Sequence, residues 1–249
     1  MKKLIHRFLS DEGEYPAAGI PSPAYFILNI ITVLTIGTSL HYTLRWSYTN
    51  IRNLLKYIIV TLWTLEILKI KYRWHYGFKK DLNTWVPLYF CSITLFAGIL
   101  SAFGSGLLQH IGDVFMCTGG LVGGVCFLMY PSTSLLIYPA YHFLSIHSFL
   151  YHGCMTYAGI LLNRSGMVNL TWHDMIYFFF YTVFFCLLAL ILNKKTDSNL
   201  MFISNAFPGD LGKLARRVFK KCYTLFMILI QATAPFTSIM LISLNTSLL

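Results

Sequence analysis

The chain has 249 residues, of which 56% are apolar and only 11% are charged, with a net charge of +10. Soluble domains carry about 25% charged residues, so this composition, with a mean hydropathy of +0.62, excludes most soluble folds and indicates an all-α, polytopic integral membrane protein. The basic residues lie between apolar runs, so we expect phospholipids and no nucleic acid as partners. No zinc-type spacing of Cys and His occurs, and we expect neither a metal ion nor another cofactor.

Seven apolar runs are long enough to cross a bilayer. The tail before them, residues 1–23, ends at two prolines, and the seven-helix transmembrane domain occupies residues 24–249. Pro131 is expected to separate the fourth and fifth runs, because the uncharged stretch around it is too long for one crossing. The predicted spans are residues 24–44, 54–71, 84–103, 111–130, 135–162, 174–193 and 222–246.

The loops between these spans differ strongly in charge. Fourteen Lys and Arg fall on one side of the predicted membrane, in the tail, in residues 71–80 and in residues 194–221, and only three fall on the other side. Cytoplasmic loops are enriched in Lys and Arg. The sequence therefore predicts a cytoplasmic N-terminus, a C-terminus outside and a multi-pass protein of the plasma membrane.

Residues 194–221 are expected to form a basic amphipathic segment on the cytoplasmic side. Apolar residues recur there at helical spacing opposite the cations Lys213, Arg216, Arg217, Lys220 and Lys221. One interpretation is an interfacial helix that binds the anionic phospholipids of the inner leaflet, and the other is a basic stop that only fixes the topology.

Small residues recur at a spacing of four in the fourth span, at Gly119, Gly120, Gly123 and Gly124. Such frames let helices approach closely, either inside the bundle or between two copies of the chain in a homo-oligomer.

Several acidic residues lie at or inside the spans. Glu66 is three residues before Lys69 in the second span, so it is either half of an ion pair or a functional intramembrane carboxylate. Asp81, Asp113 and Asp174 precede or begin apolar runs, where each is expected to cap a helix.

Polar side chains inside a membrane protein mark candidate sites because their burial is costly. In the fifth span, a helical period places Ser145, Ser148, Phe149 and His152 on one face, with His147 about 140° away from His152, so the two histidines are expected to do different jobs. Cys91 follows Pro87, which can leave backbone groups unpaired and open a polar cavity. A Cys with a His in reach can become a thiolate and accept an acyl group.

Three stretches of the chain resemble a known family. They are Val86-Pro87-Leu88-Tyr89-Phe90-Cys91; His152-Gly153 with the apolar run to Arg164; and Leu192-Asn193 followed by Ser198-Asn199-Leu200-Met201-Phe202 and Pro208. Over roughly residues 55–240, the chain is similar to the YwaF-like family of bacterial integral membrane proteins, whose eukaryotic relatives include transmembrane protein 164. That family is also seven-spanning.

The resemblance implies a cysteine-dependent acyltransferase that acts on phospholipids. It implies Cys91 as the acyl-accepting nucleophile, His152 as the general base and Asn199 near the headgroup end of the site, while Tyr89 replaces a histidine of the family pattern. Depth along the predicted spans favours His147 as the partner of Cys91 instead, so both histidines are kept.

With the family roles assigned, the substrate-binding set is Asn199, Tyr89, Ser148 and Glu66. The alternative function is a non-catalytic membrane protein, either a transporter of lipid or small solutes or an accessory subunit of a membrane complex.

Overall fold

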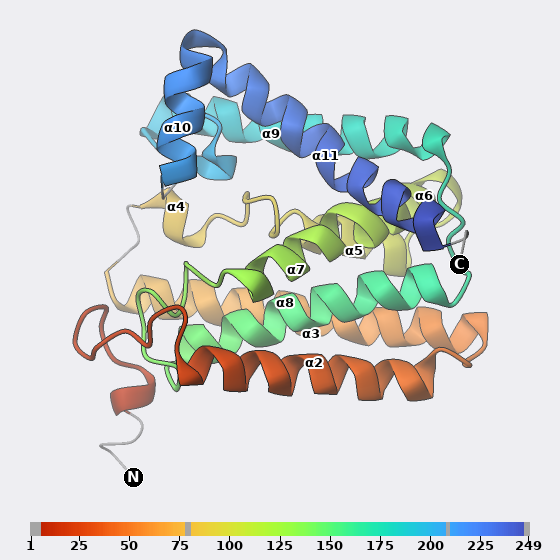
Figure 1. The fold of residues 1–249 in the computed structure, drawn as a ribbon, viewed down its shortest axis with the longest axis horizontal. Helices are drawn as coiled ribbons and strands as arrows, with labels where there is room; N and C mark the ends of the chain where they lie inside the picture. Colours follow the sequence, from red (N-terminus) through yellow and green to blue (C-terminus); the bar gives the residue numbers. More distant parts are fainter. Residues whose placement is uncertain (1–5, 78–80, 208–209, 247–249) are drawn as a thin grey trace.

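The computed structural model describes residues 6–77, 81–207 and 210–246, in which the regular structure is helical throughout (Figure 1). Long helices run roughly along the long axis (Figure 1). The long helices are α2 (Pro23–Thr43), α3 (Tyr48–His75), α8 (Phe143–Arg164), α9 (Met175–Thr196) and α11 (Tyr223–Thr246). The basic residues Lys2, Lys3, Lys79 and Lys80, and Pro208 of the family pattern, lie outside the described residues.

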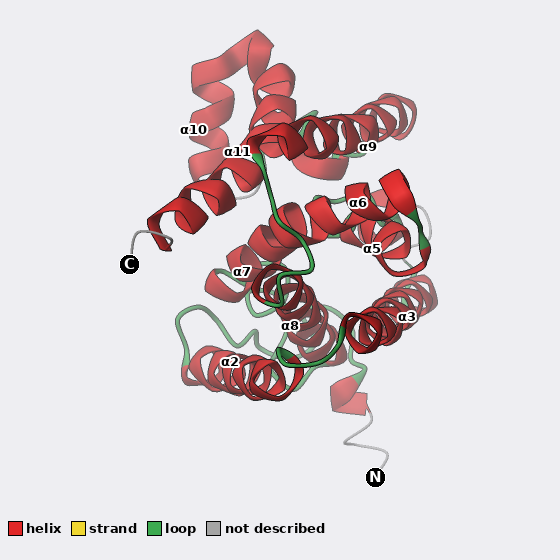
Figure 2. Ribbon diagram, turned by 90° about the vertical axis from the view of Figure 1, so that its right-hand side faces the viewer, coloured by secondary structure: helices red, strands yellow, loops and turns green. Residues whose placement is uncertain are grey.

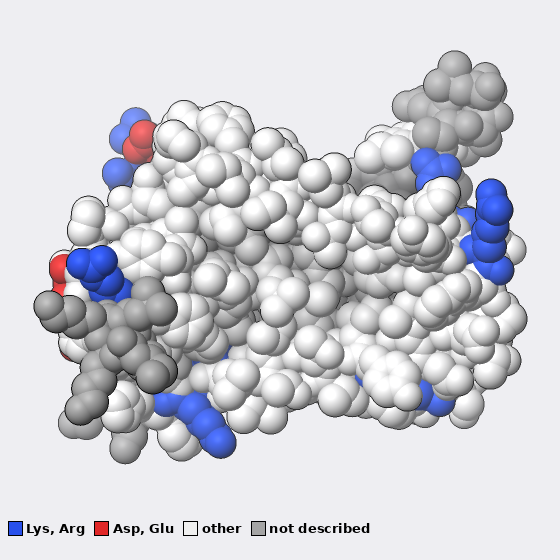
Figure 3. Space-filling view, turned by 90° about the horizontal axis from the view of Figure 1, so that it is seen from below, with Lys and Arg blue, Asp and Glu red and all other residues white. Residues whose placement is uncertain are grey.

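Four helical stretches in the described residues are long and apolar enough to cross a membrane. They are Pro23–Thr43, Gly106–Met129, Trp172–Thr196 and Gly212–Ser243. In Figure 3, Lys, Arg, Asp and Glu gather toward the two ends of the face shown and leave an uncharged band between them. This distribution is that of a membrane protein with its polar ends in water.

The helices pack in layers around a central core. Seen down the long axis, α9 and α11 form one side, α3, α8 and α2 form the other, and α5 to α7 lie between them (Figure 2). α2 packs against α8 at the edge of the bundle, and apolar residues of its outer face, such as Ile30 and Leu34, stay exposed. The core is continuous across the layers, from Leu55 and Leu62 of α3 to Phe178 of α9 and Phe236 of α11.

The third predicted span is not one helix. α4 (Leu82–Trp85) is a single turn, capped by Asp81 as predicted, and α5 (Thr94–Phe103) begins only after an irregular segment that contains Pro87. Proline lacks an N–H and disfavours helical geometry in the residue before it, and Val86 accordingly adopts an extended conformation. The predicted helical span over residues 84–103 is therefore wrong around Pro87, and residues 86–93 cross the interior as irregular backbone.

The fourth predicted span begins earlier than residue 111. α6 (Gly106–Phe115) packs against α5 as a hairpin, then passes through a π-helix at Met116–Gly120 into α7 (Leu121–Met129). Within this π-helix, the Cys117 carbonyl accepts a hydrogen bond from Asn163 Nδ2 at 3.0 Å. The predicted helix breaker is observed, because α7 ends before Pro131.

Asp113 does not cap a helix, contrary to prediction. It lies in the last turns of α6 and is 5% exposed, and its carboxylate accepts two hydrogen bonds from Arg52, at 2.7 and 2.5 Å. Ser101 of α5 also donates to it at 2.6 Å. The pair therefore ties α3 to the α5–α6 hairpin with a buried bidentate ion pair.

The fifth predicted span also begins too early in the sequence. Residues 131–142 form successive turns, and α8 begins at Phe143, where Nδ1 of His142 accepts the hydrogen bond of the Leu144 N–H at 3.1 Å. α9 begins as predicted, because Thr171 and Asp174 form a capping box. Short polar side chains at an N-cap satisfy the unpaired N–H groups of a first turn.

The N-terminal tail is docked and not free. The hydroxyl of Tyr72 in α3 donates to the Ser10 carbonyl at 2.5 Å, and the Tyr138 hydroxyl donates to Glu12 at 3.1 Å. Arg73 of α3 reaches the same Glu12 carboxylate at 3.7 Å. The tail therefore covers the ends of α3 and of the turns before α8.

The predicted basic segment contains two different structures. After α9, the loop 197–207 folds into the bundle with a 3₁₀ turn at Leu200–Phe202, and α10 (Asp210–Phe219) follows as an amphipathic helix. Leu214 and Val218 of α10 are 52% and 61% exposed. A 3₁₀ turn at Lys220–Cys222 then leads into α11.

Candidate functional site

A polar cavity of about 470 Å³ lies near the end of the bundle where the N-terminal tail is docked. It is enclosed by α3, the irregular segment before α5, α7, α8, the turn at Leu200–Phe202 and α11. Its lining residues are Glu66, Lys69, Arg73, Asn83, Thr84, Val86, Tyr89, Phe90, Cys91, Ser92, Gly123, Cys126, Thr133, Ile137, Leu144, His147, Ser148, Tyr151, His152, Met201, Phe202 and Gln231.

The cavity brings together most of the candidate residues, from α3, the segment before α5 and α8. Both histidines, the thiol and three of the four expected substrate-binding residues line it: Cys91, His147, His152, Tyr89, Ser148 and Glu66. Asn199 does not line it. The roles of these residues stay predictions, because their proximity alone assigns none of them.

Two adjacent glycines of α7 hold the Cys91 segment and α8 close together. A Cβ added at Gly123 would lie 3.7 Å from Cα and Cβ of Cys91. A Cβ added at Gly124 would lie 2.9 Å from the carbonyl oxygen of His152. The backbones that carry the thiol and the imidazole therefore pack on consecutive residues of one helix.

The four glycines of the fourth span make contacts inside the chain. Gly119 lies against the rings of Phe115 and Phe178, and Gly120 lies against the side chain of Thr94. Their observed packing partners are thus residues of the same bundle, and contact between two copies of the chain stays a prediction.

The imidazole of His152 is held in one orientation. Its Nδ1 lies 2.8 Å from the carbonyl oxygen of Ser148, and its ring stacks on Phe127 with a centroid distance of 3.8 Å. A carbonyl only accepts hydrogen bonds, so Nδ1 carries the proton of the neutral ring and Nε2 keeps the lone pair. The neutral ring can therefore accept a proton at Nε2.

His147 is held by its other nitrogen. Its Nε2 lies 3.0 Å from the Leu65 carbonyl oxygen of α3, so Nε2 donates and Nδ1 keeps the lone pair. His147 Nδ1 is buried with no hydrogen-bond partner. The two histidines are therefore fixed through opposite nitrogens, and His147 in addition joins α8 to α3.

Charged groups lie at one side of the cavity. Lys69 Nζ contacts Glu66 Oε1 at 2.7 Å, which confirms the predicted ion pair within α3. Glu66 is 1% exposed, and Arg73 lines the cavity one turn further along the helix. A buried carboxylate is tolerated when a cation pairs with it. Glu66 also lines the cavity, and its functional role stays a prediction.

Asn199 organises the loop that closes the cavity. Its Oδ1 accepts hydrogen bonds from the N–H groups of Ser204 and Asn205 at 3.2 and 2.9 Å, and its own N–H donates to Asn83 Oδ1 at 2.7 Å. Asn199 therefore contacts the cavity only indirectly, by holding the side chain of Asn83, which lines it.

The same loop places two apolar side chains in the cavity wall with an unusual backbone. Met201 and Phe202 have φ angles of 55° and 53°, in the left-handed region that residues with a Cβ rarely adopt. Gln231 of α11 donates to the Met201 carbonyl at 3.1 Å, and Tyr223 donates to the Phe202 carbonyl at 3.1 Å. Strained backbone held by outside donors is typical of functional sites.

The prediction that Ser145, Ser148, Phe149 and His152 share one face of the fifth span is only partly confirmed. Ser148 and His152 line the cavity, but Ser145 does not, and Phe149 faces a different pocket. The cavity side of α8 carries His147 and Tyr151 as well, because its lining stripe is wider than one row of side chains.

Sequence reasoning missed Tyr151, Lys69 and Gln231 as lining residues. The cue for Tyr151 was available, since it lies three residues after Ser148, one helical turn along.

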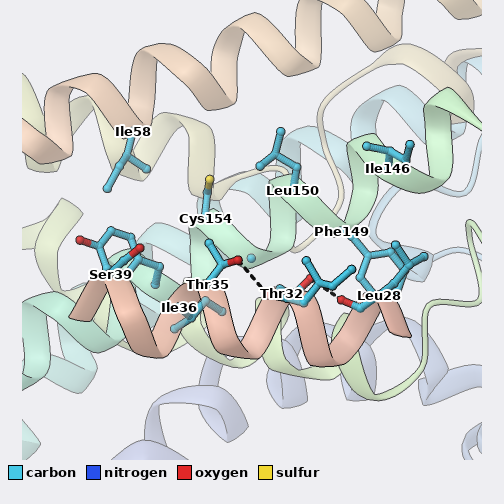
Figure 4. A pocket seen from close by; sticks show the side chains of 13 residues that line it. Leu28, Thr32, Thr35, Ile36, Ser39, Ile58, Ile146, Phe149, Leu150 and Cys154 are labelled. Atoms are coloured by element: carbon cyan, nitrogen blue, oxygen red, sulfur yellow. Dashed lines mark hydrogen bonds between the residues drawn. The ribbon is translucent and has the colours of Figure 1, made fainter. Parts of the chain in front are cut away.

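A second pocket, of about 390 Å³, lies between α2, α3 and α8 (Figure 4). Its wall is largely apolar, with Leu28, Ile36, Ile58 and Leu150 among the residues that line it. The hydroxyls of Thr32 and Thr35 bond to carbonyls of their own helix, as the dashed lines in Figure 4 show. This pocket offers room for an acyl chain and lacks the histidines and charges of the polar cavity.

Comparison with known proteins places the chain in a family. The model of the TMEM164 family matches residues 20–242, a range that includes every residue lining the polar cavity. No curated protein and no solved structure matches the chain. On the strength of a match that covers nearly the whole chain, this membrane protein belongs to the TMEM164 family.

Proposed function

We propose that this protein is a membrane-embedded lipid acyltransferase that moves an acyl chain from a phospholipid to a lysolipid through a thioester on Cys91. The observation that carries the proposal is that Cys91 and His152 line one cavity, with the lone pair of His152 at Nε2. Apolar and charged residues on different walls of that cavity suit a lipid that has both a tail and a polar headgroup.

In the first half-reaction, His152 Nε2 takes the proton of the Cys91 thiol, and the sulfur attacks the ester carbonyl of the donor lipid. A carbon–sulfur bond forms and the carbon–oxygen ester bond breaks. The proton passes from His152 to the departing alkoxide, which leaves as a lysolipid. In the second half-reaction, the hydroxyl of the acceptor lipid gives its proton to His152 and attacks the thioester, and the thiol is restored.

The remaining lining residues are assigned to substrate binding. Glu66 and its partner Lys69 present charge to the polar part of the lipid, while Tyr89 and Ser148 present hydroxyls beside the thiol and the base. Asn199 acts by fixing Asn83 and the loop that closes the cavity. His147 is the second candidate base, because its Nδ1 is free.

Reconstituted protein tests this assignment. Vesicles containing a phospholipid with a labelled acyl chain and an unlabelled lysolipid should yield labelled product with the wild type, but not with Cys91→Ala. Cys126→Ala is the matched control, because Cys126 is a second thiol on the same cavity and should be dispensable. Equal activity of Cys91→Ala and wild type would refute the proposal.

Two variants, compared in the same assay, distinguish the roles of His152 and His147. His152→Gln should abolish transfer because it removes the base. His147→Gln keeps an N–H that can bond to the Leu65 carbonyl and should retain most of the activity. The reverse result would make His147 the base.

In the membrane, we propose seven passes, with the N-terminus in the cytoplasm. In support, α3 and α8 run beside the four most apolar stretches, and the broken segment from α4 to α5 supplies a further pass (Figure 1). α10 lies at the end that this orientation makes cytoplasmic, and we assign its basic face to anionic phospholipids of the plasma membrane.

An impermeant thiol reagent tests this orientation on intact cells. It should label Arg45→Cys, between α2 and α3, and should reach Cys222, at the start of α11, only after permeabilisation. Labelling of Cys222 in intact cells would reverse the orientation.

A second candidate function is lipid binding without chemistry, in a transporter or an accessory subunit. The pocket between α2, α3 and α8 favours it, because that pocket suits an acyl chain and carries no catalytic pair (Figure 4). Retention of bound phospholipid by wild type and Cys91→Ala alike, with no transfer by either, would support this alternative.

A further inference from the structure

The polar cavity contains a phenol group without a hydrogen-bond partner. Tyr151 is 3% exposed, and its hydroxyl oxygen is buried and unpaired. Other tyrosines that pack in the bundle use their hydroxyls: the buried Tyr72 and Tyr223 donate to Ser10 and Phe202, and the partly buried Tyr181 donates to Ile93. A buried polar group without a partner costs stability, so an unpaired hydroxyl in a cavity wall calls for an explanation.

The ring of Tyr151 is held in place without its hydroxyl. It stacks on His147, with ring centroids 5.9 Å apart and planes at 16°, and it meets the edge of the His152 ring at 5.3 Å. Tyr151 is thus fixed beside the proposed base and lines the same cavity as Cys91. Its hydroxyl is left available to a bound molecule.

Three other donors that line the cavity already have partners. Lys69 is paired with Glu66, the Gln231 amide donates to two backbone carbonyls, and Tyr89 donates to Asn83 at 3.4 Å. His152 cannot donate from Nε2 while it acts as the base. A reaction that builds negative charge on a carbonyl oxygen requires a donor aimed at that oxygen.

We propose that Tyr151 is a catalytic residue whose O–H donates a hydrogen bond to the acyl carbonyl oxygen of the lipid substrate. The inference rests on the proposed function. When the Cys91 sulfur attacks the carbonyl carbon, the electron pair of the C=O bond moves to oxygen, and the Tyr151 hydroxyl stabilises that oxyanion. The hydrogen bond lasts until the ester oxygen leaves and the C=O bond re-forms, and the phenol proton is not transferred.

The test is the rate at which Cys91 becomes acylated when the purified protein is mixed with phospholipid vesicles. Tyr151→Phe should slow acylation by about 10²–10³-fold, the usual effect of losing an oxyanion donor. The matched control is Tyr181→Phe, which removes a buried tyrosine hydroxyl outside the cavity and should leave the rate unchanged.

The outcomes separate this inference from the proposal on which it rests. If the wild type forms no acyl adduct, the proposed function fails. If the wild type and Tyr151→Phe acylate at the same rate, the function stands and the role of Tyr151 is refuted.

A subtler variant distinguishes chemistry from packing. Incorporation of 3-fluorotyrosine at position 151 keeps the ring and makes the phenol a stronger hydrogen-bond donor. The kcat of acylation should therefore rise while its KM stays unchanged. An unchanged or slower kcat would overturn the inference even if Tyr151→Phe failed to fold.

Discussion

Replacement of Gly124 by alanine tests the packing that places His152 beside the Cys91 segment. The added Cβ would lie 2.9 Å from the His152 carbonyl oxygen and 3.0 Å from the Thr156 nitrogen, and closer still to the Thr156 hydroxyl. Comfortable contacts between heavy atoms begin near 3.5 Å, so α8 must retreat from α7 by about 0.5–1 Å. Because two of these atoms belong to the backbone, side-chain rotation cannot relieve the contact.

Gly123→Ala is the matched control. Its Cβ would meet Met155 at 3.6 Å and Cys91 at 3.7 Å, which are ordinary van der Waals distances. Both glycines lie inside α7, so alanine brings a similar gain in helix propensity at each site, of about 1 kcal/mol. The difference between the two variants therefore isolates the steric term, which for overpacking is about 1–3 kcal/mol.

Thermal unfolding in one detergent and the acylation rate of Cys91 measure the two consequences. Gly124→Ala should unfold at a lower temperature than Gly123→Ala, and its acylation should be slower by about 10²-fold, the effect of displacing a catalytic group by 1 Å. Gly123→Ala should gain up to about 1 kcal/mol of stability over the wild type and should acylate at the wild-type rate. Equal stability and equal rates in the two variants would refute the close approach of α7 and α8.

Two further predictions concern stability alone and use the same unfolding assay. Asp113→Asn should lower the free energy of unfolding by about 3–5 kcal/mol, because it leaves Arg52 charged and buried without a counter-charge; a loss below 1 kcal/mol would show that the pair contributes little. Tyr151→Phe should be as stable as the wild type or more stable, since its hydroxyl has no partner to lose, whereas Tyr181→Phe should lose about 1 kcal/mol with its bond to Ile93. Clear destabilisation by Tyr151→Phe would show that its hydroxyl has a structural partner.

The helical class and the order of the apolar segments were predictable from the sequence, because hydropathy and loop charge are averaged over about 20 residues and so do not depend on any single position. Local signals were also reliable where both partners are close in sequence. Thr171 and Asp174 cap the start of α9, and Glu66 pairs with Lys69 one turn away. Each of these contacts spans at most four positions of the chain.

Long-range contacts could not be predicted from one sequence. Asp113 is separated from Arg52 by 61 positions, and nothing near either residue indicates the other. The helices are interrupted before α5 at Pro87 and before α8 at the turns that precede His142. The sequence stays apolar through both interruptions, so hydropathy does not indicate them.

The cavity itself depends on segments that are far apart in the sequence. Its thiol and histidines were predicted from their chemistry. Tyr151 could have been predicted from its spacing to Ser148, but its unpaired hydroxyl is a property of the folded protein alone.

The central claim is that Cys91 accepts an acyl group, and intact-protein mass spectrometry after incubation with phospholipid tests it most directly. The wild type and Cys126→Ala should both gain the mass of one acyl chain, hydroxylamine should remove it, and Cys91→Ala should gain nothing. An adduct that persists in Cys91→Ala, or a wild type that stays unmodified while phospholipid is bound, would contradict the account.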